Sequence, residues 1–83
     1  MNYPVGTILR QHSSQKYWGE LYSTCVIGTI IIITGVWDAG YTFKIIYSPT
    51  HKINELIKKY NEYSEIIHTY YVPINKLGIL LYG

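Results

Sequence analysis

The residue types that most often carry out chemistry in proteins are scattered along this chain of 83 residues. His12, His51 and His68 stand far apart, and none has a second ligand at the spacing that metal sites use. Cys25 is the single cysteine, and neither it nor any serine has a base nearby in sequence that could activate it as a nucleophile. The sequence also lacks a glycine-rich phosphate loop, a CxxC or HExxH motif and paired carboxylates on a helix face. We therefore expect a protein that is not an enzyme, with no catalytic, cofactor-binding or metal-binding residues.

The charge of the chain points away from nucleic acid as a partner. Seven basic and five acidic residues give a formal net charge of +2, and the bases are spread along the sequence. Proteins that bind nucleic acid usually gather lysine and arginine on one face or in one stripe. We expect no nucleic-acid binding.

Residues 21–37 form the longest stretch without a charged side chain. Seventeen residues make a helix of roughly 25 Å, and flanking turns bring it close to the ~30 Å thickness of a hydrocarbon core. Trp18 and Trp37 flank the stretch, and tryptophan prefers the headgroup level, so both are expected to be interfacial anchors. A buried helix of a soluble domain is the alternative, but the remainder of the chain is short for covering it. The prediction is a transmembrane helix over residues 21–40.

Small residues recur on one side of this predicted helix. Thr24, Gly28, Ile31 and Gly35 follow one another at spacings of four, three and four, which places them on one face. Small residues let a neighbouring helix approach closely, so this face is expected to meet a partner helix in the membrane. The opposite, isoleucine-rich face is expected to contact membrane lipid, and a structural lipid is compatible with it.

Asp38 is the one charge whose depth is ambiguous. It follows Trp37 directly and precedes an alanine and a glycine, which favours an interfacial position. If the helix continues beyond residue 40, Asp38 lies deeper, and an acid inside the membrane indicates a functional site. Residues 41–48 are expected to be an interfacial connector.

A second helix is predicted over residues 49–71. Ser48 and Pro49 are typical of a helix start. Its apolar residues alternate at spacings of three and four, and its opposite face carries acids and bases in balance. Because a surface helix on lipid usually has a basic polar face, and tyrosines make a poor coiled-coil core, we expect this amphipathic helix to dock on a larger protein. The expected docking face consists of Ile53, Leu56, Tyr60, Tyr63, Ile67 and Tyr70.

The two ends are expected to be extended. Residues 1–20 form a polar N-terminal arm, and residues 72–83 form an apolar C-terminal tail that lies in a groove of a partner or adds a strand to it. The expected tail contacts are Leu77, Leu80, Leu81 and Tyr82. The fold class expected from these segments is an all-α membrane protein with one transmembrane helix, one extramembrane amphipathic helix and extended termini.

This arrangement of arm, span, amphipathic helix and tail resembles the small single-span accessory subunits of mitochondrial inner-membrane oxidative-phosphorylation complexes. The resemblance lies in the architecture and in no residue motif. It implies a non-catalytic structural or assembly subunit of a respiratory-chain complex in the mitochondrial inner membrane, without a cofactor. It also implies that other subunits and membrane lipid are the partners, rather than further copies of the same chain. An accessory subunit of ATP synthase and a single-span regulator of a pump or transporter are the alternatives.

Overall fold

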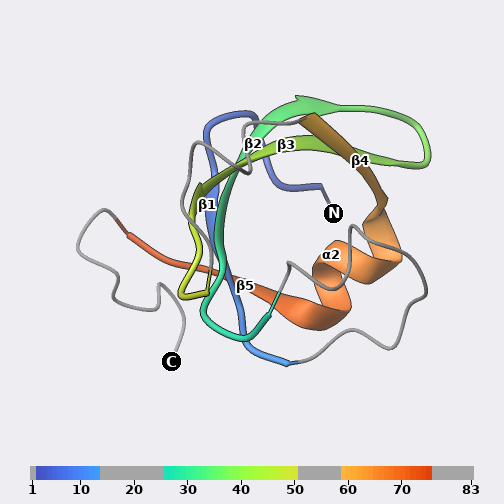
Figure 1. The fold of residues 1–83 in the computed structure, drawn as a ribbon. Coiled ribbons are helices and arrows are strands. Elements are labelled where there is room, and N and C mark those ends of the chain that lie inside the picture. The colour runs from blue at the N-terminus through green and yellow to red at the C-terminus, as the bar shows by residue number, and fades with distance from the viewer. Residues whose placement is uncertain (1, 14–25, 51–58, 76–83) are drawn as a thin grey trace.

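The structure, a computed structural model, describes residues 2–13, 26–50 and 59–75. These residues form one curled antiparallel sheet of five strands, with one short helix across its open side (Figure 1). The strands are β1 (Ile8–Gln11), β2 (Ile30–Val36), β3 (Gly40–Tyr47), β4 (Lys59–Tyr63) and β5 (Tyr71–Pro73), and the helix is α2 (Ser64–Tyr70).

The strand order in the sheet is β4-β3-β2-β1-β5. Strands β1 to β4 follow one another as an antiparallel meander, and β5 returns to pair with the outer side of β1. Helix α2 connects β4 to β5, the two ends of the sheet, and it contacts β3, β4 and β5. The curled sheet and the helix together enclose the core (Figure 1).

The composition of residues 26–36 explains why β2 is a strand. Nine of these eleven residues are valine, isoleucine or threonine, and the other two are glycine. Branching at Cβ restricts the side chain in a helix but suits the pleated surface of a sheet. The burial pattern has the period of two that a strand requires, because Ile31 and Ile33 are buried while Ile32 between them is only partly covered.

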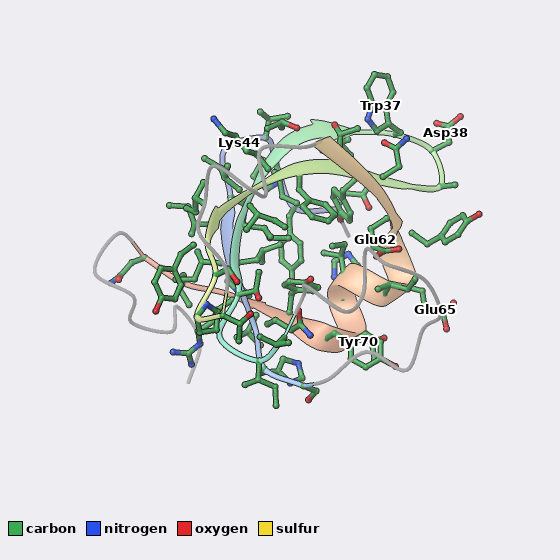
Figure 2. All side chains as sticks on the ribbon, viewed as in Figure 1. Trp37, Asp38, Lys44, Glu62, Glu65 and Tyr70 are labelled. Carbon is green, nitrogen blue, oxygen red and sulfur yellow. The ribbon has the colours of Figure 1, made fainter. Side chains whose placement is uncertain are left out.

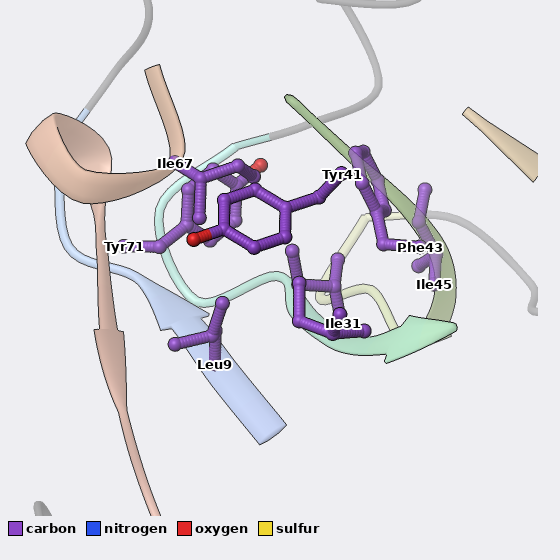
Figure 3. Close-up of a cluster of buried hydrophobic side chains, with 8 residues drawn as sticks. Leu9, Ile31, Tyr41, Phe43, Ile45, Ile67 and Tyr71 are labelled. Atoms are coloured by element: carbon purple, nitrogen blue, oxygen red, sulfur yellow. The ribbon is translucent and has the colours of Figure 1, made fainter. Parts of the chain in front are cut away.

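The core lies on the concave side of the sheet, under α2. Strand β3 sends alternate side chains into it and leaves Lys44 exposed. The close-up in Figure 3 shows how residues from the strands and from α2 meet there. The buried cluster consists of Leu9, Ile31, Ile33, Tyr41, Phe43, Ile45, Ile67 and Tyr71.

A buried polar pair joins β1 to the returning strand β5. The hydroxyl of Tyr71 donates to Oε1 of Gln11 at 3.1 Å, and Nε2 of Gln11 donates to the carbonyl oxygen of Ser13 at 2.8 Å. Both side chains are almost fully buried, and these two bonds replace the water contacts that burial removes from the Gln11 amide. The pair also helps to fix the register in which Gln11 lies opposite Tyr71.

The expected all-α membrane fold is wrong. Residues 26–40, most of the expected transmembrane helix, form a turn, strand β2 and the tip of a hairpin, and the expected connector over residues 41–48 is almost entirely β3. Residues 21–25 lie outside the described residues. Across the described segments, no helix has the length and apolar character to cross a bilayer. The expected single-pass localisation in the mitochondrial inner membrane depends on that helix, and so does the respiratory-chain setting. Both expectations are therefore wrong as well. The preference of β-branched residues for a strand is the physical reason.

Among the described residues of the expected amphipathic helix over 49–71, only the seven residues of α2 are helical. Residues 59–63 form β4 and pair with β3, and residues 51–58 are outside the described part. Pairing in a sheet outweighs the helical spacing of these residues, as tertiary context often does. The terminal segments differ as well, because the N-terminal arm contains β1 and the start of the C-terminal tail belongs to β5.

Candidate functional site

A groove of about 510 Å³ opens at the end of the sheet where the β2–β3 hairpin meets β4. Trp37 and Tyr63 are its two large walls and the most exposed aromatic side chains of the described chain, at 62% and 67%. Large aromatic side chains at a hollow are typical of contact surfaces. We call this site the aromatic groove. It is lined by Trp37, Ala39, Gly40, Tyr41, Thr42, Asn61, Glu62 and Tyr63.

Trp37 is held in place by two hydrogen bonds. Its backbone N–H donates to the carbonyl oxygen of Gly40 at 2.9 Å, which closes the hairpin around Asp38 and Ala39. Its indole Nε1 donates to Oγ1 of Thr42 at 3.2 Å. The polar edge of the indole is therefore satisfied within the chain, and the exposed part of the side chain is the apolar ring. Figure 2 shows this ring projecting from the hairpin.

Gly35 gives the indole of Trp37 the space that it occupies. Gly35 lies opposite Thr42 in the β2–β3 ladder. A Cβ atom at this position would collide with the Thr42 hydroxyl and would lie 3.0 Å from Nε1 of Trp37. The absence of a side chain therefore allows the hydroxyl and the indole to meet, and the hydrogen bond between them depends on it.

Gly40 positions the opposite wall. It is the strand neighbour of Tyr63, and a Cβ atom there would collide with the backbone carbonyl oxygen of Glu62 and lie 3.1 Å from Cα of Tyr63. Strand β4 thus lies directly against a residue without a side chain. The N–H of Ser64 extends this contact by donating to the carbonyl oxygen of Ala39 at 3.1 Å. Tyr63 is brought beside the hairpin by this close approach.

Gly40 lies between the two aromatic walls across the sheet. Trp37 neighbours Gly40 across the hairpin, and Gly40 neighbours Tyr63 across the β3–β4 ladder. Adjacent strands lie about 4.7–4.9 Å apart, so the two Cα atoms are roughly 9–10 Å from each other. Both side chains border the same hollow.

The surroundings of the aromatic groove are acidic. Asp38 is exposed at the hairpin tip beside Trp37, and Glu65 is exposed in the first turn of α2, two residues after Tyr63, whereas the side chain of Glu62 is buried. In Figure 2 these carboxylates lie in the same half of the molecule as Trp37, and Lys44 lies in the other half. None of the described lining residues is lysine, arginine or histidine. The groove therefore favours a ligand with positive rather than negative charge.

A second polar cluster surrounds the hydroxyl of Tyr41, a residue of the groove lining. The hydroxyl of the buried Tyr41 accepts from the backbone N–H of Tyr3 at 3.0 Å, donates to Oδ1 of Asn2 at 3.2 Å and lies 3.0 Å from Nε2 of His68. Partial burial lowers the pKa of His68 and raises the pKa of Tyr3, so the imidazole and the phenol are both favoured in their neutral forms. A neutral imidazole with its proton on Nε2 donates a hydrogen bond to the Tyr41 hydroxyl oxygen. The cluster attaches residues 2–3 to the fold.

The remaining chemical candidates stay apart. His12 is exposed and hydrogen-bonds Ser13 at 2.7 Å, whereas His51 and Cys25 lie outside the described residues. Within residues 2–13, 26–50 and 59–75, no three histidine, cysteine or acidic side chains are gathered closely enough to hold a metal ion. Asp38, whose depth the sequence left open, is exposed.

The residues expected on a membrane helix face have different positions in the sheet. Gly28 lies in a turn with φ +95°, where a side chain is strained, Ile31 is in the core, and Gly35 lies beside Trp37. They share no helix face, because they belong to a turn and a strand. Thr24 and the second expected anchor, Trp18, are outside the described residues.

The residues expected on the docking helix separate in the same way. Tyr63 lines the groove, Ile67 is in the core, Tyr70 packs against the core and Tyr60 belongs to β4. The other expected contacts fall outside the described part: Ile53, Leu56, Leu77, Leu80, Leu81 and Tyr82.

Two residues from separate predicted surfaces meet in the groove. Trp37 was expected at a membrane interface and Tyr63 on a docking helix, and both line the same hollow. Gly40, Thr42 and Asn61 also line this hollow and were not expected from the sequence. A signal for the hairpin was available, since Asp38, Ala39 and Gly40 separate two runs rich in β-branched and aromatic residues.

No family model matches this chain, and neither the curated proteins nor the solved structures contain a match. Since a fold by itself does not determine a function, the interpretation rests on the residues, contacts and charges of the site.

Proposed function

We propose that this chain is a non-catalytic interaction module that docks an extended segment of a partner protein in the aromatic groove. The observation that carries the proposal is the pair of exposed walls, Trp37 and Tyr63, fixed on either side of Gly40. Aromatic-lined grooves are a recurring mode of peptide recognition, and tryptophan and tyrosine are enriched among the residues that dominate binding energy.

The position of the groove suits a polypeptide. It begins at the hairpin tip and reaches β4, which is an edge strand of the described sheet. A segment lying there meets the two aromatic side chains and the polar groups of Thr42 and Asn61 in the lining. A strand at a sheet edge also offers main-chain hydrogen bonds to an added segment.

Other ligand classes fit less well. A groove for single-stranded nucleic acid combines aromatic stacking with positive charge along the backbone, and here the described surroundings are acidic. The lining also offers no histidine, cysteine or lysine to act as a base or nucleophile. The proposal keeps a non-catalytic role in an assembly, as expected from the sequence, and does not include a membrane span.

Selection of random displayed peptides on the immobilised full chain tests the proposal, with affinities then measured by fluorescence anisotropy of synthetic peptides. Trp37→Ala and Tyr63→Ala are each expected to weaken the selected peptides by at least about tenfold, because each removes a wall of the groove. Tyr47→Ala is the matched control, since Tyr47 is also an exposed tyrosine but does not line the groove, and it is expected to leave affinity unchanged.

The result depends on the variants being folded, which circular dichroism and thermal unfolding establish. Equal affinity of folded Trp37→Ala, Tyr63→Ala and the unsubstituted chain would show that peptides bind elsewhere. Failure to select any peptide that binds the folded chain would also contradict the proposal.

A further inference from the structure

We infer that the aromatic groove selects a cationic side chain of the docked segment, lysine or arginine, and holds it against the aromatic side chains of Trp37 and Tyr63. This inference rests on the proposed function and names the chemical feature that the groove recognises. It combines the geometry of the two rings with the charge around them.

The geometry supplies two exposed aromatic side chains, Trp37 and Tyr63. The indole N–H of Trp37 is already bonded to Thr42, so that wall offers its aromatic face to a ligand. The face of an aromatic ring carries negative electrostatic potential, and a cation within about 6 Å of the ring centroid is attracted to it. Both aromatic side chains are exposed and line the same groove, so a cationic group bound there lies beside them.

The charge distribution favours the same occupant. Asp38 adjoins one wall in sequence and is exposed, and Glu65 follows the other wall and is exposed as well. Exposed ion pairs are weak, so these carboxylates orient a cation rather than fix it. With no basic residue among the described lining, nothing there repels an ammonium or guanidinium group.

An apolar occupant such as proline or leucine is the alternative that the experiment must separate. It would pack on the same rings but would gain no electrostatic attraction from the carboxylates. Norleucine and citrulline provide that separation, because norleucine keeps the aliphatic stem of lysine and citrulline keeps the planar end of arginine, and both are neutral.

The test uses the selected peptide with the highest affinity and replaces its lysines by norleucine and its arginines by citrulline, one at a time. At one position, the neutral replacement is expected to weaken binding to the full chain by roughly 3- to 30-fold, the range that a cation–π contact gives. In Trp37→Leu, the same replacement is expected to change peptide affinity by less than about twofold. The indole ring, which attracts the cationic side chain but not its neutral replacement, is absent from this variant.

Asp38→Asn gives a second readout in a variant that keeps both walls. It removes an exposed charge outside the core, so the fold is expected to remain intact. The preference for the cationic peptide is expected to decrease, and its binding is expected to depend less on salt concentration than in the unsubstituted chain.

The outcomes distinguish the inference from the function on which it rests. Peptides that require Trp37 and Tyr63 but bind equally well with neutral replacements would overturn the inference and leave the docking function standing. Selected peptides that contain no lysine or arginine would do the same. Absence of any peptide that depends on Trp37 and Tyr63 would overturn both.

Discussion

Replacing Ile31 by alanine is expected to lower the free energy of unfolding by about 2–5 kcal/mol. Ile31 lies in the central strand β2, its side chain is fully buried, and its strand neighbours are Leu9 in β1 and Ile45 in β3. Removing its outer carbons takes away buried apolar surface and leaves a cavity in the middle of the core. Since small domains are stabilised by about 5–15 kcal/mol in total, a loss of this size is a large part of the stability.

Ile32→Ala is the matched control, because it makes the same chemical change one residue further along the same strand. Ile32 is only partly buried and is expected to show a clearly smaller loss. Urea denaturation followed by circular dichroism measures both variants. Large losses at Ile31 and Ile33 with a small loss at Ile32 are the period-two pattern of a strand, and equal losses at all three positions would contradict the sheet.

Replacing Gly40 by alanine is expected to cost about 1–3 kcal/mol of stability and to weaken peptide binding. The added Cβ atom overlaps the backbone carbonyl oxygen of Glu62, so β4 must move away from β3. A backbone atom cannot turn aside as the end of a flexible side chain can. The movement also displaces Tyr63, which is the strand neighbour of Gly40 and a wall of the groove.

Ala39→Ser is the control for Gly40→Ala. It also adds one heavy atom to the hairpin, but Ala39 is exposed at the turn. Its stability is expected to remain close to that of the unsubstituted chain when both variants are compared by urea denaturation. Because Ala39 lines the groove, this variant is a control for stability alone. Unchanged stability and affinity in Gly40→Ala would mean that β4 does not lie against Gly40.

Part of the organisation could be predicted from the sequence. The apolar stretch that ends at Trp37 is central to the fold, since it contributes the middle strand β2, although its lack of charge had favoured a membrane helix. The range 49–71, in which a helix was expected from the spacing of apolar residues, includes α2. Ile67, expected on the apolar face of that helix, is buried in the core. Trp37 was expected to be a membrane anchor and Tyr63 a residue of a docking helix, and the contact role that is now proposed for both in one groove is a prediction.

The rest could not be predicted because the deciding signals were weak or distant. Consecutive isoleucines fill both faces of β2, so the alternation that identifies a strand is absent, and such a run cannot be distinguished from a helix by periodicity alone. The β-branched composition was the better guide. The close approach of Gly40 to Glu62 joins residues far apart in sequence, and only the β3–β4 pairing reveals it.

The most direct test of the aromatic groove as a docking surface is a ¹⁵N–¹H NMR titration of the full chain with a selected peptide. The largest shift changes are expected at the indole N–H of Trp37 and the backbone amides of Gly40, Thr42 and Tyr63, with the amide of Tyr47 nearly unchanged. Largest changes around Tyr47 or in the turn at Gly28, with the Trp37 indole unaffected, would contradict the groove as the binding site.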